Sequence, residues 1–171
     1  NSPIMISGGR TPITLYKKLN KMNLEWDDNS LVLSDERDVE ISNELSNEGT
    51  IAKLLGLKEG KRILISPRNP ESKKILKANK EYDLSILGMG EDGHFASIFP
   101  NVKEIKKVIA SKKTVLYIDE GYPDVPRYSL SLNEILKSKE IILLISNKEK
   151  FDLINTNRSH EEFLPIDYLL K

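Results

Sequence analysis

Short apolar runs that show little alternation with polar residues recur along this chain, and they constrain its fold more than any other feature. A strand that is covered on both faces needs apolar side chains on both, so such runs are typical of parallel sheets that lie between helices. Helical patterns separate several of the runs. We therefore predict an α/β fold with a mainly parallel sheet flanked by helices on both faces. The runs cover residues 4–6, 31–33, 63–65, 84–87, 115–118 and 141–145.

Two of the helical patterns carry signals for where a helix begins or ends. The first follows Thr11 and Pro12, so we predict that Thr11 caps this helix and that Pro12 is its first residue. The second runs over residues 45–55 and is followed by Gly56, a residue type that commonly ends helices.

Length and composition exclude several classes of protein. A chain of 171 residues predicts one domain over residues 1–171, because domains typically hold roughly 100–200 residues. The 26 basic and 26 acidic residues cancel, so no overall field attracts nucleic acid or an anionic membrane. The absence of cysteine excludes disulfides, thiolate nucleophiles and cysteine-ligated zinc, and two histidines, His94 and His160, argue against a multi-histidine metal site. We expect a cytoplasmic protein without nucleic-acid or membrane partners, and we leave its oligomeric state open.

Polar residues gather directly after three of the predicted strands, at the edge where parallel sheets bind their ligands. The first cluster is a turn before a helix, in which two glycines let the backbone approach an anion and the helix start supplies free N–H groups. Such a turn suits phosphate, but an ordinary tight turn before a capped helix explains this segment equally well. The three clusters are residues 7–11, 34–37 and 88–94.

Residues 88–93 match the G-x-G-x-x-G pattern of dinucleotide-binding loops, yet we reject that interpretation. The pattern requires a long helix packed on the sheet, and Pro100 leaves room for barely two helical turns after Gly93. His94 and Asp92 favour acid–base chemistry, because neutral imidazole is the usual general base near pH 7 and a carboxylate can orient it. For an isolated loop histidine, a structural hydrogen bond to the backbone would be the better interpretation. The residues around His94 make the catalytic interpretation the better one here.

Arginine is scarce in this chain, with six residues against twenty lysines, so the position of Arg37 at a strand end is informative. The planar guanidinium suits a carboxylate or a phosphate. The alternative is a surface ion pair with its acidic neighbours, which we consider the weaker interpretation.

Together these segments resemble the 6-phosphogluconolactonase family, within the superfamily that includes glucosamine-6-phosphate deaminase. Residues 87–100, with the sequence LGMGEDGHFASIFP, are similar to the most specific motif of that family. Residues 34–37, followed by Asn47, resemble its second motif. Residues 7–12 resemble its phosphate loop, with Arg10 where a small polar residue is commoner.

The resemblance extends over most of the chain. Residues 127–132 resemble an arginine-containing strand motif of the family, and Lys150 matches a lysine that opens a late helix, although Asn147 replaces the usual glycine. The family usually carries a further strand and helix before the phosphate loop, whereas six residues precede Ser7 here. The resemblance therefore implies a single Rossmann-like domain that lacks the family's N-terminal strand and helix.

The resemblance implies a carboxylic ester hydrolase that converts 6-phospho-D-glucono-1,5-lactone to 6-phospho-D-gluconate in the pentose phosphate pathway, with no metal or organic cofactor. It implies that His94 is the general base and that Asp92 orients it. We expect backbone N–H groups of residues 88–93 to stabilise the oxyanion. The residues expected at the phosphosugar substrate are Ser7, Gly8, Gly9, Arg10, Thr11, Asp35, Arg37, Asn47, Gly88, Gly90, Arg127 and Lys150.

Two alternatives remain at this point. The first is a deaminase or isomerase of the same superfamily, but that branch typically has an aromatic residue at the position of Arg37 and a glutamate at that of Phe99. Without that glutamate, part of the proton relay for ring opening and ammonia loss is missing. The second is a sensor domain that binds a sugar phosphate without turnover, and such a domain has no need of the Asp92 and His94 pair.

Overall fold

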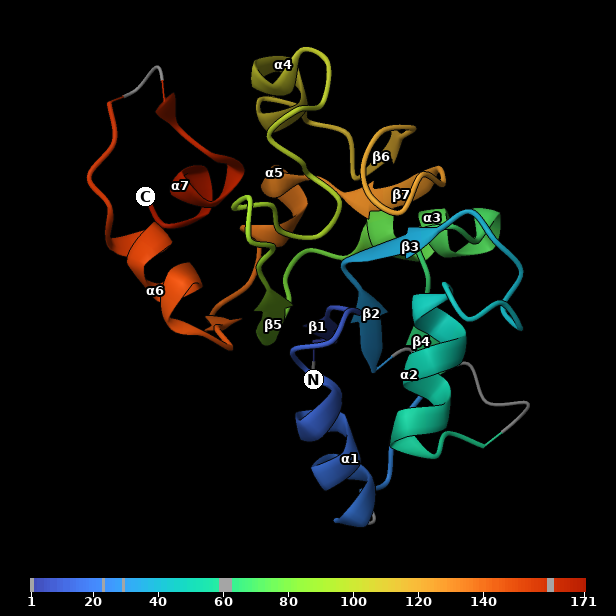
Figure 1. Ribbon diagram of the computed structural model, residues 1–171. Helices are drawn as coiled ribbons and strands as arrows, with labels where there is room; N and C mark the ends of the chain where they lie inside the picture. The colour runs from blue at the N-terminus through green and yellow to red at the C-terminus, as the bar shows by residue number, and fades with distance from the viewer. Residues whose placement is uncertain (1, 23, 29, 59–62, 160–161) are drawn as a thin grey trace.

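A five-stranded sheet forms the centre of the computed structural model, which describes residues 2–22, 24–28, 30–58, 63–159 and 162–171 (Figure 1). His160 lies outside the described residues. Every neighbouring pair of strands in this sheet is parallel, which confirms the predicted fold class. The strands in spatial order are β4 (Leu64–Ile65), β2 (Leu31–Leu33), β1 (Ile4–Ile6), β5 (Leu84–Gly88) and β8 (Ile141–Leu144).

Helices cover both faces of the parallel sheet, because successive side chains of each strand point to opposite faces and are apolar on both. Ile6 and Leu33 belong to a buried cluster with Tyr16, whereas Met5 and Val32 belong to a second cluster on the other face. The helices of the first cluster are α1 (Ile13–Lys21) and α2 (Asn47–Leu55). Those of the second are α3 (Pro70–Ala78), α5 (Leu132–Ile135) and α7 (Pro165–Leu169).

A three-stranded antiparallel sheet lies beside the parallel one, and the sequence patterns did not predict it (Figure 1). Residues 115–118 form a strand as predicted, but this strand belongs to the second sheet, because an apolar run specifies burial and not the partner. The charged residues 35–37 also form a strand here. In spatial order the sheet contains β3 (Asp35–Arg37), β7 (Arg127–Leu130) and β6 (Val115–Ile118).

The chain passes from one sheet to the other at Ser34. Its N–H donates to the Ile6 carbonyl of β1 over 2.8 Å, and its carbonyl accepts from the Leu130 N–H of β7 over 2.8 Å. The Ser7 N–H likewise donates to the Ile86 carbonyl over 3.1 Å. Because β1, β2 and β5 are aligned in register, the polar residues that follow them meet along one edge of the sheet.

The two predicted helix boundaries have different outcomes. The prediction that Thr11 caps α1 is wrong: the capping residue is Pro12, and no side chain caps the helix. The physical reason is a turn in which the Ile13 N–H donates to the Arg10 carbonyl, so the helix begins later. The predicted end at Gly56 is confirmed, since Gly56 follows α2 with a left-handed φ of 63°.

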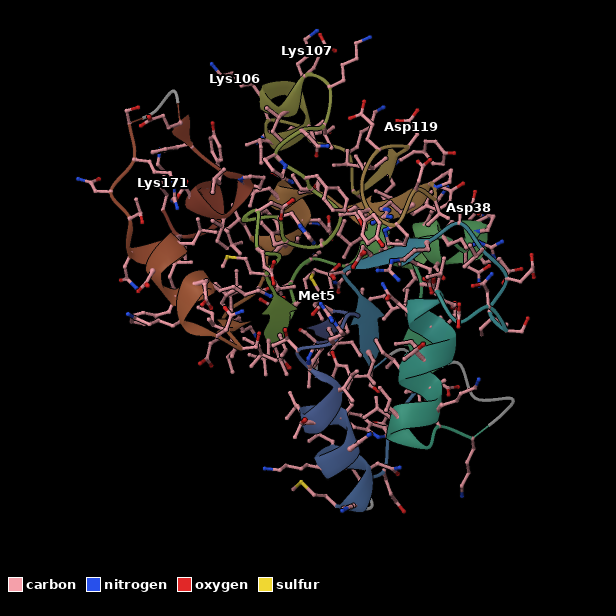
Figure 2. All side chains as sticks on the ribbon, viewed as in Figure 1. Met5, Asp38, Lys106, Lys107, Asp119 and Lys171 are labelled. Atoms are coloured by element: carbon pink, nitrogen blue, oxygen red, sulfur yellow. The ribbon has the colours of Figure 1, made fainter. Side chains whose placement is uncertain are left out.

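Apolar side chains lie in the core, and most charged side chains lie on the exterior. Figure 2 shows Met5 within the body of the molecule and Lys106 and Lys107 extending outward from α4 (Ile105–Ile109). A further helix, α6 (Lys148–Asn155), follows β8. In the part of the chain that the structure describes, no helix has the length and apolar character needed to cross a membrane.

Candidate active site

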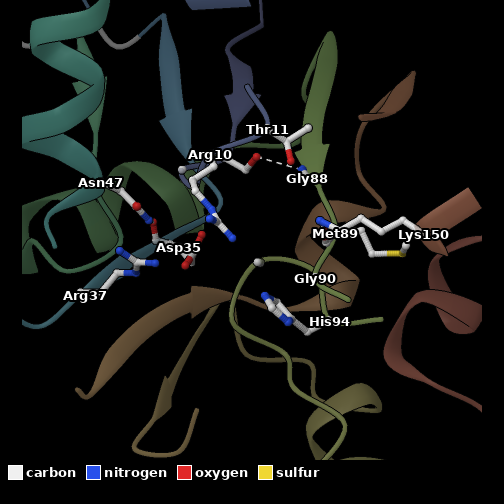
Figure 3. A pocket seen from close by; sticks show the side chains of 14 residues that line it. Arg10, Thr11, Asp35, Arg37, Asn47, Gly88, Met89, Gly90, His94 and Lys150 are labelled. Carbon is white, nitrogen blue, oxygen red and sulfur yellow. Dashed lines mark hydrogen bonds between the residues drawn. The ribbon is translucent and has the colours of Figure 1, made fainter. Parts of the chain in front are cut away.

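A cleft of about 220 Å³ lies where the carboxyl ends of β1 and β5 meet β3 (Figure 3). It contains twelve of the fourteen residues that the sequence analysis placed at the site. His94 and the predicted phosphate loop, more than eighty residues apart in the chain, therefore line the same cavity. Its lining residues are Ser7, Gly8, Gly9, Arg10, Thr11, Asp35, Arg37, Asn47, Gly88, Met89, Gly90, His94, Ala96 and Lys150.

The loop after β1 is held by contacts that require its residue types. The Tyr16 hydroxyl donates to the Ser7 carbonyl over 2.6 Å, and the Ser7 hydroxyl accepts from the Gly88 N–H over 2.9 Å. A Cβ on Gly8 would lie 1.9 Å from the Asn47 side-chain oxygen, so a larger residue would displace Asn47. Gly9 has a φ of 85°, which favours glycine. The turn is thus fixed by contacts with α1, α2 and the end of β5.

The wall next to this loop is built by β3 and the start of α2. Asp35 is buried, and its carboxylate accepts from the Ser97 hydroxyl over 2.7 Å and from the Ser34 hydroxyl over 3.1 Å. The Asn47 side chain donates to the Asp35 carbonyl over 3.0 Å. Arg37 donates through Nη1 to the Leu45 carbonyl over 2.7 Å, whereas its buried Nε has no hydrogen-bond partner among the described residues. That N–H is a donor without an acceptor.

His94 and Asp92 form a close pair. The imidazole Nδ1 lies 2.5 Å from an Asp92 carboxylate oxygen, and the His94 N–H donates to the same oxygen over 3.2 Å. Burial raises the pKa of Asp92, but the hydrogen bonds and charge of His94 outweigh it, so the pKa lies below its ordinary value of 3.8. Because an ionised carboxylate only accepts, Nδ1 of the neutral imidazole carries the hydrogen and Nε2 is the free base.

Asp92 itself does not line the cleft. It lines an adjacent open groove that also includes His94, Arg10 and Lys150, so the imidazole borders both hollows. Asp92 therefore contacts the imidazole from outside the cavity.

Lys150 adds a positive charge to the wall from the first turn of α6. Its ammonium group donates to the Met89 carbonyl over 2.6 Å. Asn147, which replaces the family's usual glycine, caps this helix by accepting from the Lys150 N–H over 3.0 Å. With Arg10 and Arg37, Lys150 gives the cleft three cations against the single carboxylate of Asp35, a balance that suits an anionic ligand.

Arg127 is the second predicted site residue that the structure keeps out of the cleft. Its side chain is 1% exposed, and it donates to the carbonyls of Val125, over 3.1 Å, and of Pro123. Burial and the charge of Arg37 lower the pKa of Arg127 below its usual range. The guanidinium is engaged with a neighbouring loop and does not form part of the cleft wall.

The 88–93 loop differs from a dinucleotide-binding loop, and three of the N–H groups that we expected at the oxyanion have partners within the protein. No helix occurs between residue 89 and α4, all of which the structure describes. The N–H groups of Gly88, Gly90 and Gly93 donate to the Ser7 hydroxyl and to the carbonyls of His94 and Gly90. These three donors are therefore not free for an oxyanion, because the glycines use them to close the loop.

Sequence reasoning missed residues that support the site without lining it. Glu36, 1% exposed, accepts from the N–H groups of Arg37, Asn47 and Glu48 and from the Ser46 hydroxyl. Tyr16 was hidden in an apolar helical pattern that says nothing about its hydroxyl. A run of three charged residues after a strand was the one available signal for Glu36, since full burial of one of them needs a local set of donors.

Comparisons with known proteins identify the family that the chain resembles in sequence and fold. Residues 2–171 match the family model described as glucosamine-6-phosphate isomerases/6-phosphogluconolactonase. The chain is 30% identical to a 6-phosphogluconolactonase from Caulobacter vibrioides, with 96% of this chain and 76% of that protein covered. It is 33% identical to one from Thermotoga maritima, with 87% and 71% covered. The crystal structure of a Thermotoga maritima 6-phosphogluconolactonase superimposes with a TM-score of 0.75 at 31% identity, over 91% of this chain and 74% of that one.

Proposed function

The chain belongs to the glucosamine-6-phosphate isomerase/6-phosphogluconolactonase family, and we propose that it hydrolyses 6-phospho-D-glucono-1,5-lactone with His94 as the general base. The activity is that of its named relatives and is the second step of the pentose phosphate pathway. The observation that carries the assignment of residues is that His94 and the 7–11 loop line one cleft. We also propose a cytoplasmic location, which the absence of cysteine supports.

The phosphate of the substrate binds at the loop after β1. There the backbone of Gly8 and Gly9, the Thr11 hydroxyl and the N-terminal end of α1 supply donors. Arg10, Arg37 and Lys150 add positive charge.

Hydrolysis then proceeds by attack of water on C1 of the lactone. His94 Nε2 takes a proton from the water as its oxygen bonds to C1, and the ionised Asp92 stabilises the imidazolium that forms. Because the glycine N–H groups of the 88–93 loop are engaged, we assign stabilisation of the oxyanion to the cationic side chains of the cleft. Collapse of the tetrahedral intermediate breaks the bond between C1 and the ring oxygen, which receives the proton from His94.

Replacement of His94 by alanine tests this assignment. We expect kcat for the lactone to fall by roughly 10²–10⁴-fold, the usual contribution of a positioned general base. Binding of glucose 6-phosphate, followed by calorimetry, should change little, because the phosphate loop remains. The lactone also hydrolyses spontaneously, so rates are taken above the buffer rate. Wild-type turnover in His94→Ala would remove the imidazole from the mechanism.

The deaminase alternative makes a different prediction. Ammonia release from glucosamine 6-phosphate would support it, and its absence alongside lactone hydrolysis would exclude it. The site favours the lactonase, because the aromatic ring of Phe99 packs on His94 with ring centroids 4.4 Å apart and provides no second carboxylate for a proton relay.

A further inference from the structure

A stack of side chains lies behind the imidazole of His94. The Phe99 ring lies 4.4 Å from the His94 ring, centroid to centroid, at an interplanar angle of 42°. The guanidinium carbon of Arg127 lies 5.0 Å from the centroid of the same Phe99 ring, in cation–π geometry. Phe99 is 4% exposed, so it connects a buried cation to the base at the cleft.

The loop at residues 121–125 fixes the position of Phe99. A Cβ on Gly121 would lie 2.5 Å from an edge carbon of the Phe99 ring, so the loop backbone passes directly against the ring. Arg127 holds this loop through its bonds to the carbonyls of Val125 and Pro123. Arg127 therefore acts on Phe99 in two ways: it contacts the ring directly, and it holds the loop that packs against the ring.

His94 needs a second point of support. Its side chain is 30% exposed, and its bond to the 45% exposed Asp92 fixes one atom of the ring. A ring held at one atom can swing about that atom and carry Nε2 out of line with the water. General-base catalysis requires that Nε2 stay within hydrogen-bond reach of the proton it removes. The Phe99 contact restricts this swing.

We propose that Phe99 is a positioning residue that holds the imidazole plane of His94, and that Arg127 serves the reaction through Phe99 and the 121–125 loop. This inference rests on the proposed function of His94 as the base. It replaces the sequence-based interpretation of Arg127 as a substrate ligand, which the guanidinium's place outside the cleft wall does not favour.

Replacement of Phe99 by leucine is the first test, with Tyr117→Leu as the matched control. Tyr117 also packs edge-on against an aromatic ring, that of Tyr128 at 5.3 Å, but it lies on β6 and away from the cleft. For Phe99→Leu we expect kcat to fall roughly 10-fold to 100-fold with KM changed less than about twofold, since a small misplacement of a catalytic group has effects of this size. Tyr117→Leu should retain both constants.

The tautomer of His94 provides a readout that does not depend on activity. The sequence has two histidines, so the ¹⁵N spectrum of the imidazoles is simple to assign with a His160→Gln variant. In the wild type we expect the Nδ1–H tautomer, and in Phe99→Leu a shift toward the Nε2–H form as the bond to Asp92 loosens. If the wild type fails to accelerate lactone hydrolysis, the proposed function is wrong, while this spectrum still decides the positioning of the ring.

Two substitutions at Arg127 separate positioning from substrate binding. Arg127→Lys keeps the charge but loses the planar guanidinium, and Arg127→Met loses both. Positioning predicts a reduced kcat and a nearly unchanged KM in both variants. Binding of substrate by charge predicts a raised KM in Arg127→Met and a KM near the wild type in Arg127→Lys. That result would overturn the assignment of Arg127.

Thermal melts check that each variant is folded. If Arg127→Met does not fold, the results for Phe99→Leu and Arg127→Lys decide. Unchanged kcat and tautomer in Phe99→Leu would overturn the proposal.

Discussion

The absence of a side chain at Gly90 determines how His94 and Asp92 meet. A Cβ at this position would lie 2.1 Å from His94 Nδ1 and 2.6 Å from the Asp92 carboxylate oxygen that Nδ1 contacts. Movement of a flexible side chain does not relieve this clash, because the atoms that a Cβ would meet are the two that join His94 to Asp92. Gly90 therefore belongs to the positioning of the base as much as to the wall of the cleft.

Gly90→Ala should accordingly separate the imidazole from the carboxylate. We expect kcat to fall by about 10²-fold with the protein still folded, measured by lactone hydrolysis and by thermal melting. The comparison is Gly88→Ala, where a Cβ would make an ordinary contact 3.7 Å from the Ser7 hydroxyl and should cost much less activity. Equal losses in the two variants would contradict this account of Gly90.

Single residues were predictable from the sequence where their chemistry is rare in the chain. His94, Asp92 and Arg37 stood out because histidine and arginine are scarce and because they follow predicted strands. Arg127 was named only through the resemblance to the family's strand motif, and its role depends on which carbonyls and rings surround it. Those neighbours come from loops whose conformation no local pattern specifies.

At the scale of elements, Glu36 joins β3 to the start of α2. Its carboxylate accepts from the Asn47 N–H over 2.8 Å and the Glu48 N–H over 2.6 Å, and so satisfies donors in the first turn of the helix. The same oxygens accept from the Arg37 N–H and the Ser46 hydroxyl. One buried charge therefore fixes the relative position of Arg37 and Asn47, which both line the cleft.

Glu36→Gln should remove part of the pH dependence of stability. Burial raises the pKa of Glu36 above its ordinary 4.5, more than hydrogen bonds from the Glu48, Asn47 and Arg37 amides lower it. A raised folded pKa contributes stability that is full below the unfolded value and is lost as pH rises through the folded value. The free energy of unfolding of the wild type, relative to Glu36→Gln, should therefore be larger at pH 4 than at pH 7 in urea titrations. A difference that does not change with pH would refute this.

Elements were predictable where burial alone specifies them. Strands over residues 4–6, 31–33 and 84–87 carry apolar side chains for two covered faces, and the structure confirms them. β3 was not predictable as a strand, because its charged residues are buried by specific donors and not by apolar contacts. α1 lacks the side-chain cap that we expected, because a turn closed by the hydrogen bond from the Ile13 N–H to the Arg10 carbonyl precedes the helix.

At the scale of the whole molecule, Ser97 ties the 88–99 segment to the small sheet. Its hydroxyl donates to the Asp35 carboxylate over 2.7 Å, and its N–H donates to the Ser129 hydroxyl of β7 over 3.2 Å. Ser97 is fully buried, so the loss of its hydroxyl leaves Asp35 with less support. The position of Asp35 in the cleft wall therefore depends on contacts among three separate parts of the chain.

Ser97→Ala should destabilise the protein by about 1.5–3 kcal/mol, the usual range for a hydrogen bond to a charged group. Ser85→Ala is the matched control, because Ser85 is also fully buried but bonds to the neutral Ser138 hydroxyl. It should cost about 1 kcal/mol. Urea unfolding measures both, and a Ser97→Ala loss no greater than that of Ser85→Ala would argue against the importance of the Asp35 contact.

The meeting of His94 with the phosphate loop was predictable in outline, since parallel strands bring the residues at their carboxyl ends together. The depth of the cleft was not, because one of its walls belongs to the antiparallel sheet. That sheet pairs residues 127–130 with the nearby residues 115–118 and also with residues 35–37, which are distant in the sequence. Pairings over such distances leave no periodic trace that a single sequence reveals.

Ser34 is bonded to both sheets, since its N–H donates to Ile6 of β1 and its carbonyl accepts from Leu130 of β7. Asp35 and Arg37 belong to the antiparallel sheet, whereas Ser7 and Gly88 lie at the ends of strands β1 and β5 of the parallel sheet. The relative orientation of the two sheets therefore sets the distance between these two groups of cleft residues. We expect that substitutions on β6 or β7 that change this orientation also change the affinity for a sugar phosphate, because β3 is paired with β7 and β7 with β6.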